Sequence, residues 1–190
     1  MPPADNPYEA PEGLPVPVDD GACGHLPGMQ VSSVPLTSTT GEIVDLSALA
    51  GTTVVYCYPL TGGPGLALPE GWDEIPGARG CTPQSCAFRD HHADLQALNA
   101  RVFGLSTQDT DYQREAAGRL QLPFALLCDE GLEFARALNL PTFDADGKTL
   151  IKRLTLVIED RRIEQVFYPV FPPAENAEEV LEWLSERVAS

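Results

Sequence analysis

Hydrophobic residues in this chain fall into short segments that alternate between the spacing of strands and the spacing of helices. Residues 52–58 are β-branched or aromatic at nearly every position, which is typical of a central strand buried on both faces. Residues 175–188 carry apolar side chains at helical spacing behind an acidic first turn, which suits the helix dipole. Further strands are expected at 101–106, 125–128, 150–158 and 163–167, and further helices at 109–120 and 132–138. This order predicts an α/β fold in which helices flank a mixed central sheet.

The N-terminal part of the chain has a different character from the rest. Residues 1–28 are rich in Pro, Gly and Asp and have no sustained periodicity, so we expect an extended arm there. Behind this arm, residues 31–36 and 43–45 flank the segment Thr39-Thr40-Gly41-Glu42 and predict a small hairpin. The length of 190 residues suits one domain, which we place at 29–190.

A long connection rich in Gly and Pro follows the central strand, from Pro59 to Gly80. A connection of this length in a compact domain is usually either functional or disordered. Trp72 and Ile75 are apolar enough to anchor it. We therefore expect an ordered lid at about 60–80, with a mobile surface loop as the alternative.

The charge balance limits the partners. Twelve basic residues against 28 acidic ones give a formal net charge of −16, whereas nucleic acids and anionic membranes are bound through clustered Lys and Arg. We therefore expect no nucleic-acid partner and no membrane partner. No run approaches the roughly 20 apolar residues of a membrane span, and residues 1–7 lack the basic and apolar regions of a secretory signal. These features indicate a cytoplasmic protein.

The chemistry concentrates in the segment Gly80-Cys81-Thr82-Pro83-Gln84-Ser85-Cys86. Thr82 suits a helix N-cap and Pro83 suits the first helical position, so a helix is expected from there to about residue 99. Cys81 would then lie just outside the helix N-terminus, where unpaired N–H groups and the helix dipole favour a thiolate. Cys86 would lie about one turn inside, close enough in sequence to capture an oxidised Cys81. The arrangement indicates redox chemistry.

Two other uses of this cysteine pair are less well supported by the spacing. A structural zinc site usually has two ligands separated by two to four residues and a second such pair elsewhere, and the chain has no second cysteine pair. The adjacent His91 and His92 would point about 100° apart on a helix. A thioredoxin-type dithiol normally has the spacing Cys-x-x-Cys. In a regular helix the Cα atoms of Cys81 and Cys86 would lie ~8.6 Å apart, beyond the ~7 Å limit for a disulfide, so a bond between them requires the first turns to unwind.

The chain has three further cysteines. Cys57 lies within the central strand and Cys128 ends another strand, so both are expected to be small buried hydrophobic residues. Cys23 lies in the arm, and we assign it no role.

This pattern resembles a known family, the peroxiredoxins of the Q type, also called bacterioferritin comigratory proteins. The resemblance covers about residues 28–188 and rests on five segments in the family's order. These are Tyr58-Pro59, Gly80-Cys81-Thr82-Pro83-Gln84-Ser85-Cys86-Ala87-Phe88-Arg89-Asp90, Phe103-Gly104-Leu105-Ser106-Thr107, Leu126-Leu127-Cys128-Asp129 and Lys152-Arg153-Leu154-Thr155-Leu156-Val157-Ile158.

The resemblance implies a thioredoxin-like fold and the reduction of hydrogen peroxide and organic hydroperoxides. It makes Cys81 the peroxidatic thiolate and Cys86 the resolving thiol, which would close an intramolecular disulfide. Arg153, expected in the strand 150–158, matches the arginine that contacts the thiolate and the peroxide. Pro59 matches the proline that shields the reactive cysteine, and Thr61 would hydrogen-bond the peroxide. No cofactor is implied, and the expected reductant is thioredoxin or a similar dithiol.

The chain departs from the family at one place. The family's short segment Pro-x-x-x-Thr-x-x-Cys is interrupted here, and an insertion of about fifteen residues within residues 60–79 is the simplest account. Thr61 can reach the peroxide only if this loop folds back, and Arg79, next to Cys81, could add positive potential instead.

Two other functions stay open from the sequence. The first is a thiol–disulfide oxidoreductase that acts on protein disulfides, and the second is a non-catalytic interaction module with a thioredoxin fold. For Arg153 the alternative is a strand arginine paired with a surface carboxylate. We expect the protein to act as a monomer.

Overall fold

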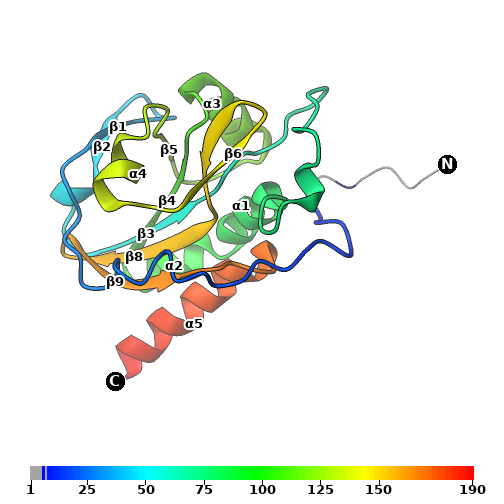
Figure 1. The fold of residues 1–190 in the computed structure, drawn as a ribbon. Helices are drawn as coiled ribbons and strands as arrows, with labels where there is room; N and C mark the ends of the chain where they lie inside the picture. Colours follow the sequence, from blue (N-terminus) through cyan, green and yellow to red (C-terminus); the bar gives the residue numbers. More distant parts are fainter. Residues whose placement is uncertain (1–5, 7) are drawn as a thin grey trace.

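The computed structural model describes residue 6 and residues 8–190, and Figure 1 gives the arrangement of its elements. One seven-stranded sheet has the order β2-β1-β5-β4-β3-β8-β9, and β6 and β7 form a separate two-stranded sheet. The strands are β1 (Pro35–Ser38), β2 (Ile43–Asp45), β3 (Thr52–Cys57), β4 (Ala100–Ser106), β5 (Leu126–Cys128), β6 (Thr142–Ala145), β7 (Lys148–Ile151), β8 (Leu154–Glu159) and β9 (Arg162–Phe167). The helices are α1 (Cys81–Asp90), α2 (His92–Ala97), α3 (Thr110–Arg119), α4 (Glu133–Leu138) and α5 (Asn176–Ala189).

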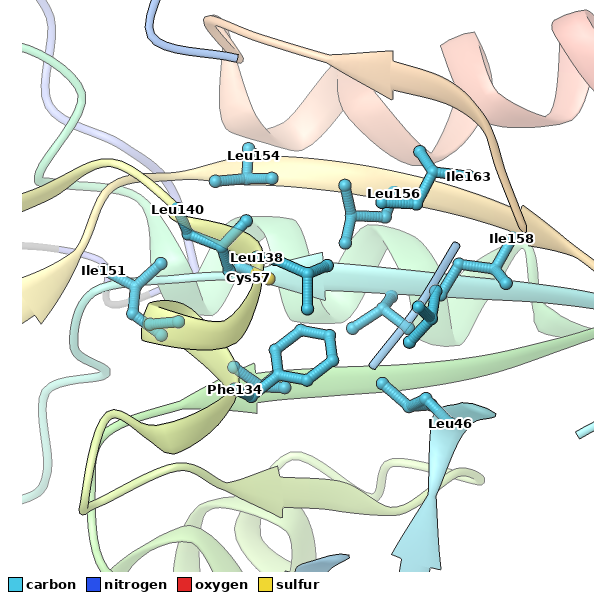
Figure 2. Packing of buried hydrophobic residues seen from close by; sticks show 14 of the residues in the cluster. Leu46, Cys57, Phe134, Leu138, Leu140, Ile151, Leu154, Leu156, Ile158 and Ile163 are labelled. Atoms are coloured by element: carbon cyan, nitrogen blue, oxygen red, sulfur yellow. The ribbon is translucent and has the colours of Figure 1, made fainter. Parts of the chain in front are cut away.

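The sheet is mixed, as the sequence predicts. The central strand β3 runs parallel to β4 on one side and antiparallel to β8 on the other. Successive side chains of a strand point to opposite faces, so β3 contributes to two separate cores. Val55 and Cys57 pack with Phe134 and Leu138 of α4 on one face. Figure 2 shows Cys57, Phe134 and Leu138 in close-up. Val54 and Tyr56 pack on the other face, against residues of α1, α2 and α5.

The predicted strand at 150–158 is wrong, because two strands of different sheets occupy it. Leu150 and Ile151 belong to β7, which pairs with β6, and the main sheet resumes only at Leu154. The N–H of Lys152 donates to the carbonyl oxygen of Pro141 at 2.9 Å, so residue 152 still pairs with the chain beside β7 and not with the main sheet. The apolar residues on both sides of 152–153 form one continuous pattern, which hides this change of sheet. Strand β6 was not predicted.

Other boundaries also differ from the expectation. The first strand of the N-terminal hairpin is 35–38 rather than 31–36, and the single helix expected at 82–99 consists of α1 and α2, separated at His91. The break reorients the chain so that Leu95 becomes fully buried. Among residues 6 and 8–190, no helix is long and apolar enough to cross a bilayer.

The described part of the N-terminal arm lies against the domain. The N–H of Gly28 donates to the carbonyl oxygen of Ile163 at 2.7 Å, and Asp20 accepts a hydrogen bond from the Tyr168 hydroxyl at 2.9 Å. Cys23, to which the sequence assigned no role, is buried in the same core as Cys57, and burial raises the pKa of its thiol to about 12. Cys57 is fully buried as expected, whereas Cys128 is only partly buried.

The segment 60–80 is anchored by its tryptophan. Trp72 begins a short 3-10 helix (Trp72–Glu74) and is 3% exposed. Its ring lies 6.0 Å from the ring of Phe143 in β6, and the two residues belong to a small apolar cluster with Ala78 and Leu150. The hairpin β6–β7, which the sequence did not predict in full, therefore supports the segment that leads to Cys81.

Candidate active site

Cys81 is the first residue of α1 and is 3% exposed. The N-cap is Gly80, not Thr82 as predicted, and its φ of +113° lies in a region that side chains with a Cβ rarely adopt. A Cβ at Gly80 would also lie 2.6 Å from Cγ of Pro173. The glycine thus lets the helix begin one residue earlier than Thr82 and brings Cys81 into the first turn, where N–H groups lack helical partners.

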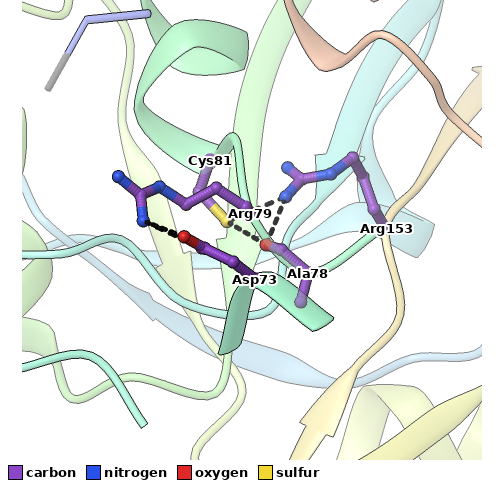
Figure 3. A network of polar contacts seen from close by, with 5 residues as sticks. All are labelled: Asp73, Ala78, Arg79, Cys81 and Arg153. Carbon is purple, nitrogen blue, oxygen red and sulfur yellow. Dashed lines mark hydrogen bonds and ion pairs between the residues drawn. The ribbon is translucent and has the colours of Figure 1, made fainter. Parts of the chain in front are cut away.

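The guanidinium of Arg153 contacts the sulfur of Cys81 (Figure 3). Its Nη2 donates to Sγ of Cys81 at 3.1 Å and to the carbonyl oxygen of Ala78 at 2.9 Å, and its Nε donates to the carbonyl oxygen of Gly77 at 3.2 Å. Arg153 is 3% exposed, so this contact is shielded from solvent. The residue lies in the junction between β7 and β8 rather than within a strand. Among the described residues it forms no ion pair with a carboxylate, which the alternative interpretation required. Arg153 thus places a buried positive charge 3.1 Å from the sulfur of Cys81.

Gln84 is a site residue to which the sequence analysis gave no role. Its side-chain oxygen accepts a hydrogen bond from Nη1 of Arg153 at 2.6 Å, and the side chain is fully buried. The sequence could have indicated this role, because Gln84 comes three residues after Cys81 and residues at this spacing share one face of a helix. A polar side chain on that face requires a buried partner.

Cys86 lies one to two turns further along α1 and is 8% exposed. Burial raises the pKa of its thiol, and the Arg89 guanidinium opposes part of this rise. All five cysteines are free thiols in this structure. Because α1 is continuous from Cys81 to Cys86, the ideal Cα separation of ~8.6 Å applies to the folded helix.

No described hydrogen bond joins the other predicted site residues to Sγ of Cys81. Pro59 is buried, and its carbonyl oxygen accepts a hydrogen bond from the Ser106 hydroxyl at 3.2 Å. The hydroxyl of Thr61 donates to Oε1 of Gln108 at 3.0 Å. Arg79 forms an ion pair with Asp73 at 2.9 Å, as Figure 3 shows.

A cavity of about 390 Å³ opens next to Cys81. Its wall includes Arg79, Gly80, Thr82 and Pro83 on the side of the helix, and Arg119 of α3. Most of the remaining wall comes from the segment 60–80 and from residues 8–10 of the arm, and its apolar residues include Tyr8, Leu60, Leu66, Leu68 and Trp72. The cavity is much larger than hydrogen peroxide and is lined mainly by apolar side chains. Among residues 6 and 8–190, no cluster of three or more His, Cys, Asp or Glu side chains has the form of a metal site.

A helix that begins at a buried cysteine, next to a buried arginine on a mixed sheet, defines a thiol-dependent redox protein with a thioredoxin-like fold. Comparison with known proteins agrees with this class. The model of the redoxin family matches residues 25–181. Chloroplastic peroxiredoxin Q of Populus jackii is 33% identical over 159 residues, which are 83% of this chain and 67% of that protein.

Solved structures point to the same group. Peroxidoxin BcpB from Mycobacterium tuberculosis has a TM-score of 0.69 at 26% identity and covers 85% of this chain and 98% of its own. The bacterioferritin comigratory protein of Xanthomonas campestris has a TM-score of 0.63 at 21% identity, covers 94% of this chain and 99% of its own, and shares the fold. The chain therefore belongs to the redoxin family and, within it, to the peroxiredoxins of the Q type, which are thiol-dependent peroxidases.

Proposed function

We propose that this peroxidase uses Cys81 as the peroxidatic thiolate and Cys86 as the resolving thiol. The observation that carries the proposal is the contact of 3.1 Å between Nη2 of Arg153 and Sγ of Cys81, at the N-terminus of α1. A buried guanidinium and a helix N-terminus both stabilise a thiolate, and the thiolate is the nucleophilic form of cysteine.

In the first step, the Cys81 thiolate attacks one oxygen of the peroxide, the O–O bond breaks, and a sulfenic acid forms at Sγ. The other oxygen leaves as water or, for an organic hydroperoxide, as an alcohol after protonation. Negative charge develops on the leaving oxygen, where Arg153 can donate hydrogen bonds. Pro83 has no N–H, and the N–H of Gln84 bonds to Gly80, so the first-turn N–H groups of Cys81 and Thr82 are the backbone donors left for the peroxide.

In the second step, the Cys86 thiolate attacks the sulfur of the sulfenic acid, an S–S bond forms, and the hydroxyl group leaves as water. The continuous helix α1 keeps the two cysteines beyond bonding range, so the first turns of α1 must unwind before this step. A dithiol then reduces the disulfide by thiol–disulfide exchange. We propose thioredoxin or a similar dithiol as this reductant.

Pro59 and Thr61 belong to the proposed site as supporting residues. Pro59 is buried and would help to exclude water from the reactive sulfur. Thr61 is buried beside the cavity residues Leu60 and Gly62, and it would donate to a peroxide after exchanging its bond to Gln108.

We propose a monomer as the active unit, and light scattering of the reduced protein tests this. A dithiol-dependent cycle requires a reducing compartment, and we propose the cytoplasm. Localisation of the full-length protein in its own cells is the corresponding test.

The cavity supports organic hydroperoxides as substrates besides hydrogen peroxide. Replacing Leu66 with aspartate is expected to lower kcat/KM for cumene hydroperoxide about tenfold, because the apolar substrate loses part of its contact with the cavity wall and meets a charge there instead. The rate with hydrogen peroxide should stay within about twofold, because this substrate does not fill the wall. Leu66 is 58% exposed, so the change costs the core little. Stopped-flow kinetics with both substrates measure the effect.

Ile43 provides a matched control, because it is 63% exposed and lies on β2, outside the cavity lining. Ile43→Asp should change neither rate. An equal loss with both peroxides in Leu66→Asp would contradict the assignment of this wall to the organic substrate.

The two roles of the cysteines are tested by intact mass. One equivalent of hydrogen peroxide should remove two hydrogens from the wild-type protein, and peptide mapping should locate the crosslink between Cys81 and Cys86. Cys86→Ser should consume one equivalent, lose turnover with thioredoxin, its reductase and NADPH, and then gain two or three oxygens at Cys81.

Two results would argue for the other functions. Rapid reduction of insulin disulfides with little reaction toward peroxide would indicate a thiol–disulfide oxidoreductase. Alkylation of Cys81 no faster than that of an ordinary exposed thiol at neutral pH would indicate a non-catalytic module.

A further inference from the structure

A chain of buried hydrogen bonds leads from Cys81 to the start of α5. Arg153 contacts Cys81 and donates to Gln84 at 2.6 Å, and Nε2 of Gln84 donates to Oδ1 of Asn176 at 3.1 Å. The same oxygen of Asn176 accepts a hydrogen bond from the Thr155 hydroxyl at 2.6 Å. Gln84, Asn176 and Thr155 are all fully buried. Neither Asn176 nor Thr155 touches Cys81 in the described contacts, and the mechanism above makes no use of them.

Each hydrogen bond in this series determines the donor and the acceptor of the next one. A guanidinium only donates, so the side-chain oxygen of Gln84 must face Arg153. The NH₂ group of Gln84 must then face α5, where it needs an acceptor because no water reaches it. Oδ1 of Asn176 is that acceptor, and its own NH₂ group points to Oε2 of Glu179 at 3.5 Å. Asn176 therefore stabilises the orientation in which the oxygen of the Gln84 amide faces the arginine.

We propose that Asn176 is a positioning residue for the peroxidatic centre, acting through Gln84 on Arg153. The proposal rests on the function proposed for Cys81. Without an acceptor at residue 176, the NH₂ group of Gln84 loses its hydrogen bond, and the amide must rotate or move to find another acceptor. Either movement takes the Gln84 oxygen away from Nη1 of Arg153. The guanidinium is then free to leave the sulfur, and misplacement of a catalytic group by about 1 Å can cost on the order of a hundredfold in rate.

The same chain of bonds opposes the second step of the reaction. Gln84 lies between Cys81 and Cys86 on α1, and its partners belong to the junction between β7 and β8 and to α5. Unwinding the first turns of α1 must break both bonds of Gln84. Asn176 thus promotes attack on the peroxide and delays formation of the disulfide, which lengthens the life of the sulfenic acid.

The test uses the full chain with three substitutions. Asn176→Leu removes the acceptor at similar volume. Asn176→Asp keeps an oxygen that accepts from Gln84 and Thr155. Leu184→Ala is the control, because Leu184 is buried on the same helix and its loss weakens α5 without touching the chain of bonds.

Rapid mixing with hydrogen peroxide measures the rate of sulfenic acid formation and the rate of disulfide formation. In Asn176→Leu the rate of sulfenic acid formation should fall about tenfold, and the rate of disulfide formation should increase several-fold. Asn176→Asp should restore the rate of sulfenic acid formation toward the wild-type value. Leu184→Ala should lower the melting temperature without changing the rate of sulfenic acid formation.

An Asn176→Leu protein that forms the sulfenic acid as fast as the Leu184→Ala protein would overturn the proposal. If Asn176→Leu does not fold, Thr155→Val replaces it in the test, because this nearly isosteric change removes one of the two donors to Asn176. Thr155→Val must then lower the rate of sulfenic acid formation and raise the rate of disulfide formation, each by a smaller factor. Unchanged rates in Thr155→Val would then overturn the proposal. A wild-type protein that does not react with peroxide would refute the proposed function itself, which separates the two failures.

Discussion

Replacing Cys81 with serine is expected to abolish peroxide reduction, with a loss of at least about a thousandfold in kcat/KM. A hydroxyl at this position remains protonated at neutral pH, so Arg153 and the helix N-terminus have no thiolate to stabilise. The buried setting also excludes any other thiol from the same contact, because Cys86 lies further along the helix and the remaining cysteines lie elsewhere. Consumption of NADPH through thioredoxin reductase and thioredoxin measures the loss.

Cys128→Ser is the matched control for this substitution. Cys128 is a partly buried cysteine at the end of β5, and it makes no described contact with Cys81 or Arg153. Its replacement should leave kcat/KM within about twofold of the wild-type value, as expected for a thiol outside the mechanism. If the Cys81→Ser protein kept its activity and the Cys128→Ser protein lost it, the peroxidatic residue would have been assigned to the wrong cysteine.

Replacing Arg153 with methionine is expected to lower the rate of sulfenic acid formation by about a hundredfold, the usual effect of removing one transition-state donor. The substitution removes the only side-chain donor to Sγ of Cys81 among the described contacts, and it leaves the carbonyl oxygens of Gly77 and Ala78 without their partner. Stopped-flow measurements of sulfenic acid formation test this effect.

Arg153→Lys distinguishes charge from geometry. A lysine keeps the positive charge but cannot span Gly77, Ala78, Gln84 and Cys81 with one planar group, so it should recover only part of the rate. Arg187→Met is the control, because Arg187 is exposed and pairs with Glu159 on the surface. A full rate in Arg153→Met would show that the helix N-terminus alone activates the sulfur.

The local features of the sequence predicted local structure well. The β-branched run at 52–57 formed the central strand, because a buried strand needs apolar side chains on both faces. The helix expected at 109–120 is α3, which Asp109 caps by accepting from the N–H of Tyr112 at 2.8 Å. The prediction failed where two signals competed. Thr82 and Pro83 are good helix starters, yet Gly80 started α1, since its positive φ and its packing against Pro173 allow no side chain.

The sequence by itself determined that two cysteines, five residues apart, lie at the beginning of a helix beside a mixed sheet. Spacing along one helix is enough for that, because it depends only on neighbours in the chain. The tertiary structure alone decided that Arg153 reaches Cys81 across 72 positions, and that Gln84 meets Asn176 across 92. It also decided that Trp72 packs against Phe143 and so anchors the segment 60–80, which precedes Cys81. These contacts depend on how the strands and helices pack in space, and no periodicity of hydrophobic and polar residues encodes which distant side chains will share a buried site.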